Sequence, residues 1–185
     1  DKKINEEHQR INHFRDNIMK FEEQLVNLPG SYGDGNSPGQ DKEVNKVNPL
    51  KHTFAGGCYI REIFMPKGQV ITTGIHKKEH PYFILKGKVS VLTENGIEQL
   101  KAPHSGITQP GTKRLIYIHQ DTLWTTVHAT DKTNVEDYFK QMPYTQSLIK
   151  AYQKNGFTSN TKNLLLNCQK EYANKYNCNA IIYDD

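Results

Sequence analysis

Two histidines four positions apart have the residue type and spacing that point most directly to chemistry. His76, Lys78 and His80 alternate within GIHKKEHPYF, and alternate residues of an extended chain project from the same face. Two imidazoles on one face ligate a divalent first-row metal weakly unless a third ligand joins them. The alternative is that both histidines are hydrogen-bonded and hold no metal.

Other recognisable chemistry is missing from the sequence. It contains no nucleophile elbow, P-loop, dinucleotide-binding fingerprint or HExxH motif. The cysteines, Cys58, Cys168 and Cys178, have no CxxC spacing, which predicts neither a disulfide framework nor a zinc knuckle. We therefore expect reduced thiols.

The stretch that must position the histidines runs from Phe54 to Thr130. Short runs of β-branched and aromatic residues alternate there with Gly, Pro and Asn. The punctuation recurs about every eight to twelve residues, which is typical of a small antiparallel barrel or sandwich. We predict a mainly β barrel over residues 49–130.

Turn signals divide this barrel into predicted strands. The signals are Met65–Gly68, Lys86–Lys88, Asn95-Gly96 and Gln109–Thr112. The strands predicted between them are Cys58–Phe64, Gln69–Ile75, Tyr82–Leu85, Val89–Leu92, Gln99–Ala102, Arg114–Ile118 and Thr122–His128.

An amphipathic helix is predicted before the barrel, over residues 1–29. Two sets of apolar residues each recur every seven positions and are offset by three, as in the a and d positions of a coiled coil. The sets are Ile4, Ile11, Ile18 and Leu25, and Phe14, Phe21 and Leu28. The same stripe serves either an oligomer seam or the packing of one helix on the barrel.

The remaining segments are a linker and a C-terminal extension. Residues 30–48 are rich in Gly, Ser, Asn and Pro without an apolar period, which predicts a linker or surface loop. Residues 131–185 predict helices, with an N-cap at Asp131–Asn134 and a break at Pro143. The apolar spacing after the break continues through Leu148, Ile149 and Tyr152.

Length and charge narrow the possible partners. The 185 residues fit one core with appendages. The net charge of +4 comes from 24 basic and 20 acidic residues spread along the chain, so it does not predict nucleic-acid binding. No apolar run is long enough to span a bilayer and no signal peptide opens the sequence. We therefore expect no membrane insertion and no secretion by a signal peptide.

The barrel region carries a family resemblance. MPKG, then HxxxH, then a hydrophobic run into LKGKVSV, then PGTKR before a closing strand resemble the cupin superfamily of jelly-roll barrels. More narrowly, KHTFAGGCYIREIFMPKG, IHKKEHPYFILKGKVSVLTENG and QPGTKRLIYIHQDTLWTTVHAT resemble cupin-like proteins of tailed bacteriophages and prophages. The resemblance covers about residues 50–130 and implies a cupin-like jelly-roll barrel, without an established activity to carry over.

The resemblance also implies a set of metal-ligand positions. Cupins typically bind a divalent metal through two His and one Glu in the first motif and one His in the second. Here Gly74 stands at the first His position, His76 at the second and His80 at the Glu position. Arg114 replaces the His of the second motif, and His128 becomes the third ligand if its strand turns inward. The metal would be iron, manganese, nickel or zinc. Other candidates for the third ligand are Glu79, His104 and His119.

Arg114 gives the barrel mouth a second interpretation. A guanidinium beside His76 and His80, with Lys78 on the same strand face, favours an anionic ligand such as a carboxylate, a phosphate or a sugar acid. The alternative is a structural salt bridge from Arg114 to Glu62, Glu79 or Asp121.

Three function classes follow. The first is a non-catalytic phage-type structural or interaction module, in the virion or the host cytoplasm, that docks to copies of itself or to other phage structural proteins. The second is a metal-dependent cupin enzyme with His76, His80 and His128 as ligands. The third is a binding module for a small anionic ligand, centred on Arg114. Two altered ligand positions argue against the enzyme and the helical ends argue for the module, so the sequence favours the first class.

Overall fold

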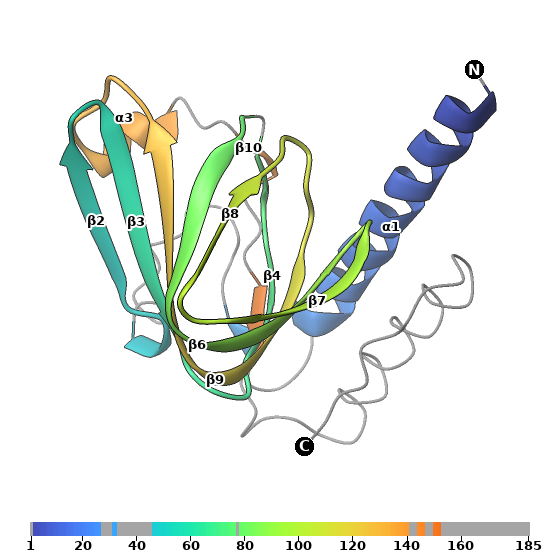
Figure 1. Ribbon diagram of the computed structural model, residues 1–185, viewed down its shortest axis with the longest axis horizontal. Helices are drawn as coiled ribbons and strands as arrows, with labels where there is room; N and C mark the ends of the chain where they lie inside the picture. The colour runs from blue at the N-terminus through green and yellow to red at the C-terminus, as the bar shows by residue number, and fades with distance from the viewer. Residues whose placement is uncertain are drawn as a thin grey trace.

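The computed structural model describes residues 2–26, 31–32, 46–76, 78–140, 144–146 and 150–152. These residues form a mainly β protein with a long N-terminal helix (Figure 1). The elements in chain order are α1 (Lys2–Val26), β1 (Ser31–Tyr32), β2 (Leu50–Ala55), β3 (Cys58–Met65), β4 (Val70–Thr72), β5 (Ile75–His76), β6 (His80–Thr93), β7 (Gly96–Lys101), β8 (His104–Thr108), β9 (Leu115–Ala129), α3 (Val135–Lys140), β10 (Tyr144–Gln146) and β11 (Lys150–Tyr152). The prediction of a mainly β fold is confirmed.

Nine of the described strands belong to one curled antiparallel sheet (Figure 1). One path through it runs β1-β11-β4-β9-β3-β2, and β6 pairs with β7, β8 and β9. The remaining pair, β10 and β5, forms a separate two-stranded sheet. Because β9 pairs with β3, β4 and β6, it joins the parts of the curled sheet around a common interior.

A β-bulge bends the long strand β6. Before the bulge the core receives Tyr82 and Ile84, and after it the core receives Val89 and Val91. A bulge inserts one extra residue, which shifts the alternation of inward side chains by one. The pairing of β6 with β9 shifts register in this same stretch. The sequence prediction of two strands separated by a tight turn at Lys86–Lys88 was therefore wrong, because the turn signal marks a bend within one strand.

Gly87 makes the bend possible. Its φ of +97° lies in a region that residues with a Cβ rarely adopt. A Cβ built at this position would lie 2.5 Å from the carbonyl oxygen of Asp121 and 2.7 Å from Cα of Thr122. Only glycine therefore lets β6 approach the β9 backbone this closely.

Strand β9 also runs further than the sequence indicated. Arg114–Ile118 and Thr122–His128 were predicted as separate strands, but residues 115–129 form one strand. The polar residues between them, Gln120 and Asp121, are exposed while the strand continues. Their polarity therefore reflects a solvent-exposed bend within one strand, and not a loop between two strands. Strand β8 was not predicted as a strand.

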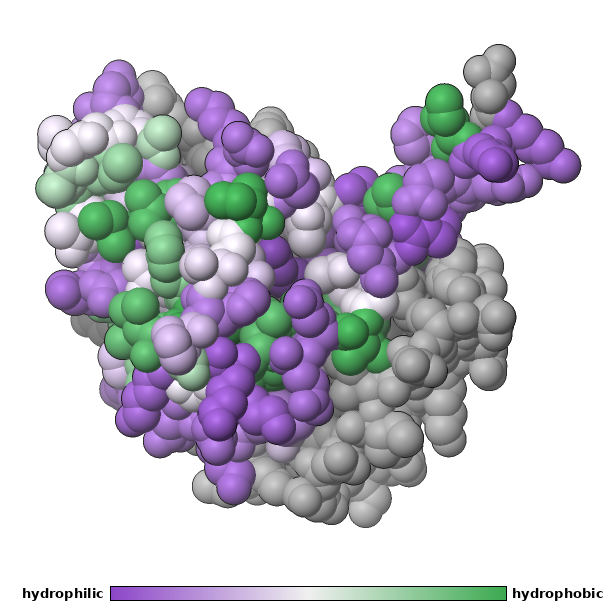
Figure 2. Space-filling model, in the orientation of Figure 1, coloured by the Kyte–Doolittle hydropathy of each residue, from purple (hydrophilic) through white to green (hydrophobic). Residues whose placement is uncertain are grey.

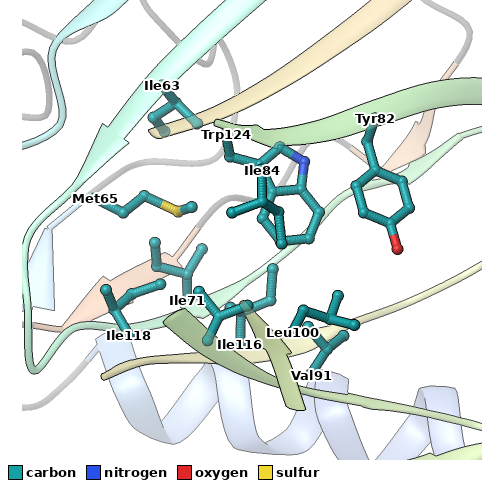
Figure 3. Packing of buried hydrophobic residues seen from close by; sticks show 11 residues of the cluster. Ile63, Met65, Ile71, Tyr82, Ile84, Val91, Leu100, Ile116, Ile118 and Trp124 are labelled. Carbon is teal, nitrogen blue, oxygen red and sulfur yellow. The ribbon is translucent and has the colours of Figure 1, made fainter. Parts of the chain in front are cut away.

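Apolar side chains from β3, β4, β6, β7 and β9 fill the interior below the barrel mouth (Figure 3). The cluster consists of Ile63, Met65, Ile71, Tyr82, Ile84, Val89, Val91, Leu100, Ile116, Ile118 and Trp124. Fully burying one such aliphatic or aromatic side chain contributes about 1.5–3 kcal/mol. This cluster gives the barrel a solid end, against which the site described below is built.

The C-terminal half of α1 packs against the barrel of its own chain. Phe14, Ile18 and Phe21 are all buried, with at most 3% of each residue exposed. Guanidinium groups of Arg10 and Arg15 donate hydrogen bonds to barrel carbonyls. Part of the apolar stripe is therefore used within the chain.

The N-terminal half of α1 projects away from the barrel and is mostly hydrophilic on its surface (Figure 2). Ile4, on the same heptad stripe, is 61% exposed. The coiled-coil seam proposed for this stripe stays a prediction. In the described parts of the chain, no helix combines the length and apolar character needed to cross a bilayer.

Both segments flanking the barrel differ from the sequence predictions. Within the predicted linker 30–48, β1 pairs with β11, and Asn48 is buried and exchanges amide hydrogen bonds with Gln69. Where helix was predicted after Pro143, residues 144–146 and 150–152 are strands. Pairing with β5 and β4 overrides the local helical spacing there.

The predicted N-cap before α3 is confirmed. Asn134 Oδ1 accepts a hydrogen bond from the backbone N–H of Asp137 at 2.9 Å, the contact expected of a capping residue. The helices predicted after residue 152 lie outside the described residues.

Replacing Gly87 with alanine is expected to destabilise the protein more than the same change at Gly96. Both glycines have positive φ, so either alanine carries backbone strain of about 1–3 kcal/mol. Only at Gly87 does the new Cβ also meet β9, and such overpacking adds about 1–3 kcal/mol. The free energy of unfolding from urea titration measures this, with Gly96→Ala as the matched control. Equal losses in the two variants would contradict the close approach of β6 to β9.

Candidate metal centre

Three histidines from three strands meet at one end of the barrel interior. His76 ends β5, His80 begins β6, and His128 lies near the end of β9. One ligand nitrogen from each ring lies within 4.8 Å of the others. The ring centroids are 4.3 Å apart for His76 and His80, and 4.4 Å apart for His80 and His128. The structure thus brings together the residues that the sequence nominated as metal ligands.

The pairing of β9 with β3 turns His128 inward. His128 lies opposite Tyr59 in the ladder, and the two rings stack with centroids 5.9 Å apart. Nε2 of His128 lies 2.9 Å from the hydroxyl oxygen of Thr126, one inward position along the strand. Such a contact orients the ring and leaves Nδ1 available as a ligand.

His80 is oriented by the backbone beside it. Its Nδ1 lies 3.4 Å from the carbonyl oxygen of Lys78. A proton on Nδ1, assigned from this contact, leaves the lone pair of Nε2 for a metal. Metal-binding histidines commonly donate their second ring N–H to a carbonyl in this way.

The three imidazoles are held in their neutral form. Burial is the largest cause, and it lowers the pKa of His76 to about 2, of His80 to about 4 and of His128 to about 3. Positive neighbours lower these pKa values further, among them Arg114 for His80 and Arg61 for His128. Each ring therefore offers an unprotonated nitrogen at neutral pH, which is the form that binds metals.

The donor set fits a divalent transition metal. Zinc–imidazole bonds are about 2.0–2.1 Å long, so tetrahedral ligand nitrogens lie about 3.3 Å apart. Nitrogens already within 4.8 Å of one another reach that spacing by small ring rotations. Three protein ligands leave a coordination position open, as in catalytic rather than structural sites.

The histidines open onto a cavity of about 80 Å³. Its apolar side belongs to the core cluster, and its polar side carries hydroxyl, imidazole and guanidinium groups. The lining residues are Arg61, Ile63, Met65, Ile71, Thr73, Gly74, His76, His80, Thr108, Arg114, Ile116, Trp124, Thr126 and His128. The site is therefore a small pocket with a polar end and an apolar end.

Of the cations predicted for the pocket, Arg114 lines it and Lys78 does not. The side chain of Lys78 is exposed, because the chain turns between β5 and β6 instead of continuing as one strand. Arg61, which sequence reasoning missed, also lines the pocket and is only 8% exposed. The structure places Arg61 in the same phase of β3 as the buried Tyr59 and Ile63, but no local signal in the sequence marks this phase as inward.

The other candidate ligands lie elsewhere. His104 contacts the hydroxyl of Tyr82, and His119 contacts Ser90. Glu79 is exposed and does not line the cavity.

The predicted salt bridge from Arg114 is not found in the described part of the chain. Glu62 instead pairs with Lys51, and the carboxylate of Asp121 accepts a hydrogen bond from the backbone of Lys67. The guanidinium of Arg114 donates to a hydroxyl, that of Thr108.

Comparison with known proteins gives structural similarities only. No family model matches this sequence, and no match is found among curated proteins. An RmlC-like cupin family protein from Methanocaldococcus jannaschii is similar with 17% identity and a TM-score of 0.40, over 49% of this chain and 87% of that chain. A cupin superfamily protein from Desulfitobacterium hafniense is similar with 10% identity and a TM-score of 0.41, over 45% and 78%. A DMSP lyase from Ruegeria pomeroyi is similar with 15% identity and a TM-score of 0.42, over 50% and 52%.

The neutral histidines predict an acid-sensitive fold in the metal-stripped protein. An unfolded histidine takes up a proton below about pH 6.5, whereas the buried rings do not until about pH 4 or lower, so acid favours the unfolded chain. Each ring lowers the free energy of unfolding by up to about 1.4 kcal/mol per pH unit in that window. Urea titrations between about pH 7 and pH 5 measure the slope.

Two substitutions test which histidines cause this dependence of the free energy of unfolding on pH. His128→Gln should reduce the slope by about the contribution of one buried ring. His8→Gln, at an exposed position of α1, should leave the slope unchanged. A wild-type slope in His128→Gln would show that this ring is not held neutral in the folded protein.

Proposed function

We propose that this protein is a metal-dependent enzyme of the cupin type, whose barrel holds one divalent transition-metal ion through His76, His80 and His128. The observation that carries the proposal is the meeting of three neutral, largely buried imidazoles at a cavity, with ligand nitrogens within 4.8 Å of one another. Perturbed titratable groups converging on a pocket are typical of a functional site.

The altered cupin pattern is compatible with this proposal. His80 supplies an imidazole where cupins typically carry a carboxylate, and His128 supplies a ligand from the closing strand in place of the second-motif histidine. The sequence interpretation weighed these changes as lost ligands. The geometry supports a relocated third ligand instead, because β9 delivers His128 to the same point.

The protein's own groups prepare the site for chemistry. A bound metal would act as a Lewis acid toward a ligand oxygen or lower the pKa of a bound water. Thr126 and the backbone of Lys78 orient two of the imidazoles. The apolar wall, which includes Trp124 and Ile116, excludes bulk water from one side and strengthens electrostatic interactions in the pocket.

The type of ligand atom restricts which metals the site can bind. Imidazole nitrogen suits zinc, iron, nickel and copper, whereas manganese prefers oxygen ligands. The described lining of the cavity contains no carboxylate. Of iron, manganese, nickel and zinc, the metals expected from the sequence, the site therefore favours iron, nickel and zinc.

A phage-type structural or interaction role is the second candidate, and it is compatible with a metal site. The projecting half of α1 supports it, because Ile4 continues the heptad stripe into a part of the helix that does not pack on the barrel. Self-association through this segment, in the virion or the host cytoplasm, is the form that this candidate takes. Measuring the molecular mass of wild type and Ile4→Glu by light scattering tests this candidate. An unchanged mass in the variant would exclude self-association through this stripe.

Metal analysis of the purified full chain tests the proposed function. We expect close to one equivalent of iron, nickel or zinc in wild type, and loss of that metal in His80→Ala and in His128→Gln. Elemental mass spectrometry gives the stoichiometry, and titration of the chelated protein with zinc gives the affinity.

His104→Ala is the matched control for these variants. It removes an imidazole from β8 that lies outside the cavity lining, so the bound metal should be retained. Wild type that neither carries metal nor takes up added zinc would overturn the proposal. Equal metal in His80→Ala and wild type would move the site away from these histidines.

A further inference from the structure

The cavity holds two guanidinium groups and no described acidic side chain. Arg61 and Arg114 both line it, together with the three histidines. Nε of Arg61 is buried and makes no hydrogen bond. No ion pair joins either arginine to an acidic residue in the described part of the chain. The site is therefore positively charged before any metal binds.

Strand pairing places Arg61 one layer below the histidines. On β3, Arg61 is the next inward residue after Tyr59, which lies opposite His128. Arg61 itself lies opposite Thr126, whose other neighbour across the sheet is Tyr82. The layer that contains Arg61 thus lies between the imidazoles and the apolar core.

Arg114 reaches this layer from the other side of the cavity. Its backbone N–H donates to the hydroxyl of Thr73, which fixes the start of β9. Its guanidinium donates to Thr108 at 3.0 Å and lies over the ring of Tyr82, with Cζ 5.3 Å from the ring centroid. Because Tyr82 is across the sheet from the partner of Arg61, both guanidinium groups border the same layer.

A buried and a half-buried guanidinium group that form no ion pair with a carboxylate are unfavourable in the free protein. Removing a charge from water without an ionic partner costs several kcal/mol. The neighbouring imidazoles are neutral and give no compensation. Burial is the largest cause acting on the pKa of Arg114 and lowers it from its ordinary value, and the opposing effects of Tyr82, Glu94 and Glu98 offset this only in part. A ligand that supplies negative charge at this layer would remove the imbalance.

We propose that the cavity binds a small monocarboxylic acid, with its carboxylate held between Arg61 and Arg114 and its apolar part against the core end of the pocket. The inference rests on the proposed function, since it names the substrate class of the same metal site. The carboxylate lies in the layer next to the histidines, so the acid is held beside the metal position. Arg61 and Arg114 are then substrate-binding residues.

The size and lining of the cavity select a short organic acid. A volume of about 80 Å³ has room for about five to eight water-sized groups. The far end is lined by apolar side chains, namely Ile63, Met65, Ile71, Ile116 and Trp124. These surfaces suit a short hydrocarbon chain and offer nothing to the hydroxyl groups of a sugar acid.

A carboxylate fits the two arginines better than a phosphate does. Guanidinium groups bind planar carboxylates through paired N–H donors. Inorganic phosphate has polar oxygens on all sides, and one side of this cavity is apolar. The apolar surface would leave part of its hydration unreplaced, which disfavours binding.

Calorimetric titration of the zinc-loaded full chain with butyrate and with butyramide tests the inference. The two compounds have closely similar shapes and differ in charge, so we expect binding of butyrate and little or none of butyramide. Inorganic phosphate is titrated separately and should bind more weakly than butyrate. Butyramide binding as tightly as butyrate, or phosphate binding more tightly, would overturn the proposal.

Substitution of each arginine locates the carboxylate. Arg61→Gln and Arg114→Gln should each weaken butyrate binding about 10-fold to 100-fold, the range for lost hydrogen bonds to a charged group. Lys51→Gln is the matched control, because it removes the same charge from a 72% exposed side chain on β2. Wild-type butyrate affinity in both arginine variants would overturn the proposal.

The stability of the ligand-free protein gives an independent readout. Replacing a buried, unpaired arginine with an apolar side chain should raise Tm, so we expect Arg61→Met to melt about 2–4 °C higher than wild type while losing butyrate affinity. A merely structural Arg61 would give the opposite, a lower Tm on substitution. The Tm of Arg61→Met can be interpreted even if Arg61→Gln folds poorly.

Zinc titration of the arginine variants separates this inference from the proposed function. Retained zinc with lost butyrate binding supports both. Retained zinc with butyrate binding that does not depend on either arginine overturns the inference alone. Butyrate binding in a wild-type protein that takes up no zinc overturns the proposed function, and with it the assignment of the acid as the substrate of a metal site.

Discussion

The antiparallel pairing of β9 is the constraint on which the rest of the structure depends. One half of this strand pairs with β3 and the other half with β4, while β6 pairs along much of its length. Its alternation sends Trp124, Thr126 and His128 into the interior at successive layers. A slip of one residue would turn all three outward. The positions proposed for the metal and for the carboxylate, and the apolar end of the cavity, are therefore set by one register.

The bulge at Gly87 extends this constraint to β6. It allows the strand to bend across β9 and to change which residues face inward. One strand therefore supplies His80 to the pocket, and Tyr82 before the bulge and Val89 and Val91 after it to the core. The sequence indicated a turn here because Lys-Gly-Lys has the composition of one. Whether a glycine ends a strand or bends it depends on the partner strand, which local sequence does not contain.

Features that depend on local sequence could be predicted, whereas features that depend on a distant strand partner could not. The choice of His76 and His80 as candidate ligands follows from their residue type and short spacing, and the N-cap at Asn134 from local hydrogen bonding. The exposed Lys78 shows that a turn between β5 and β6, and not alternation along one strand, brings the two histidines together. Arg61 could not be found this way, because both faces of β3 carry large apolar residues and neither phase is marked as inward. The short strands β10 and β11 were missed for a related reason, since their pairing partners β5 and β4 lie about seventy and about eighty positions earlier in the chain.

The distribution of charge in the barrel argues that its polar end is organised for a ligand rather than for stability. A mainly apolar interior with one buried and one half-buried guanidinium group is less stable than one filled with hydrocarbon, and in the described part of the chain neither group forms an ion pair with a carboxylate. Three buried imidazoles add an energetic penalty in acid. Natural proteins tolerate such unfavourable groups mainly where binding or catalysis uses them. The solid apolar cluster at the other end supplies the stability that this arrangement requires.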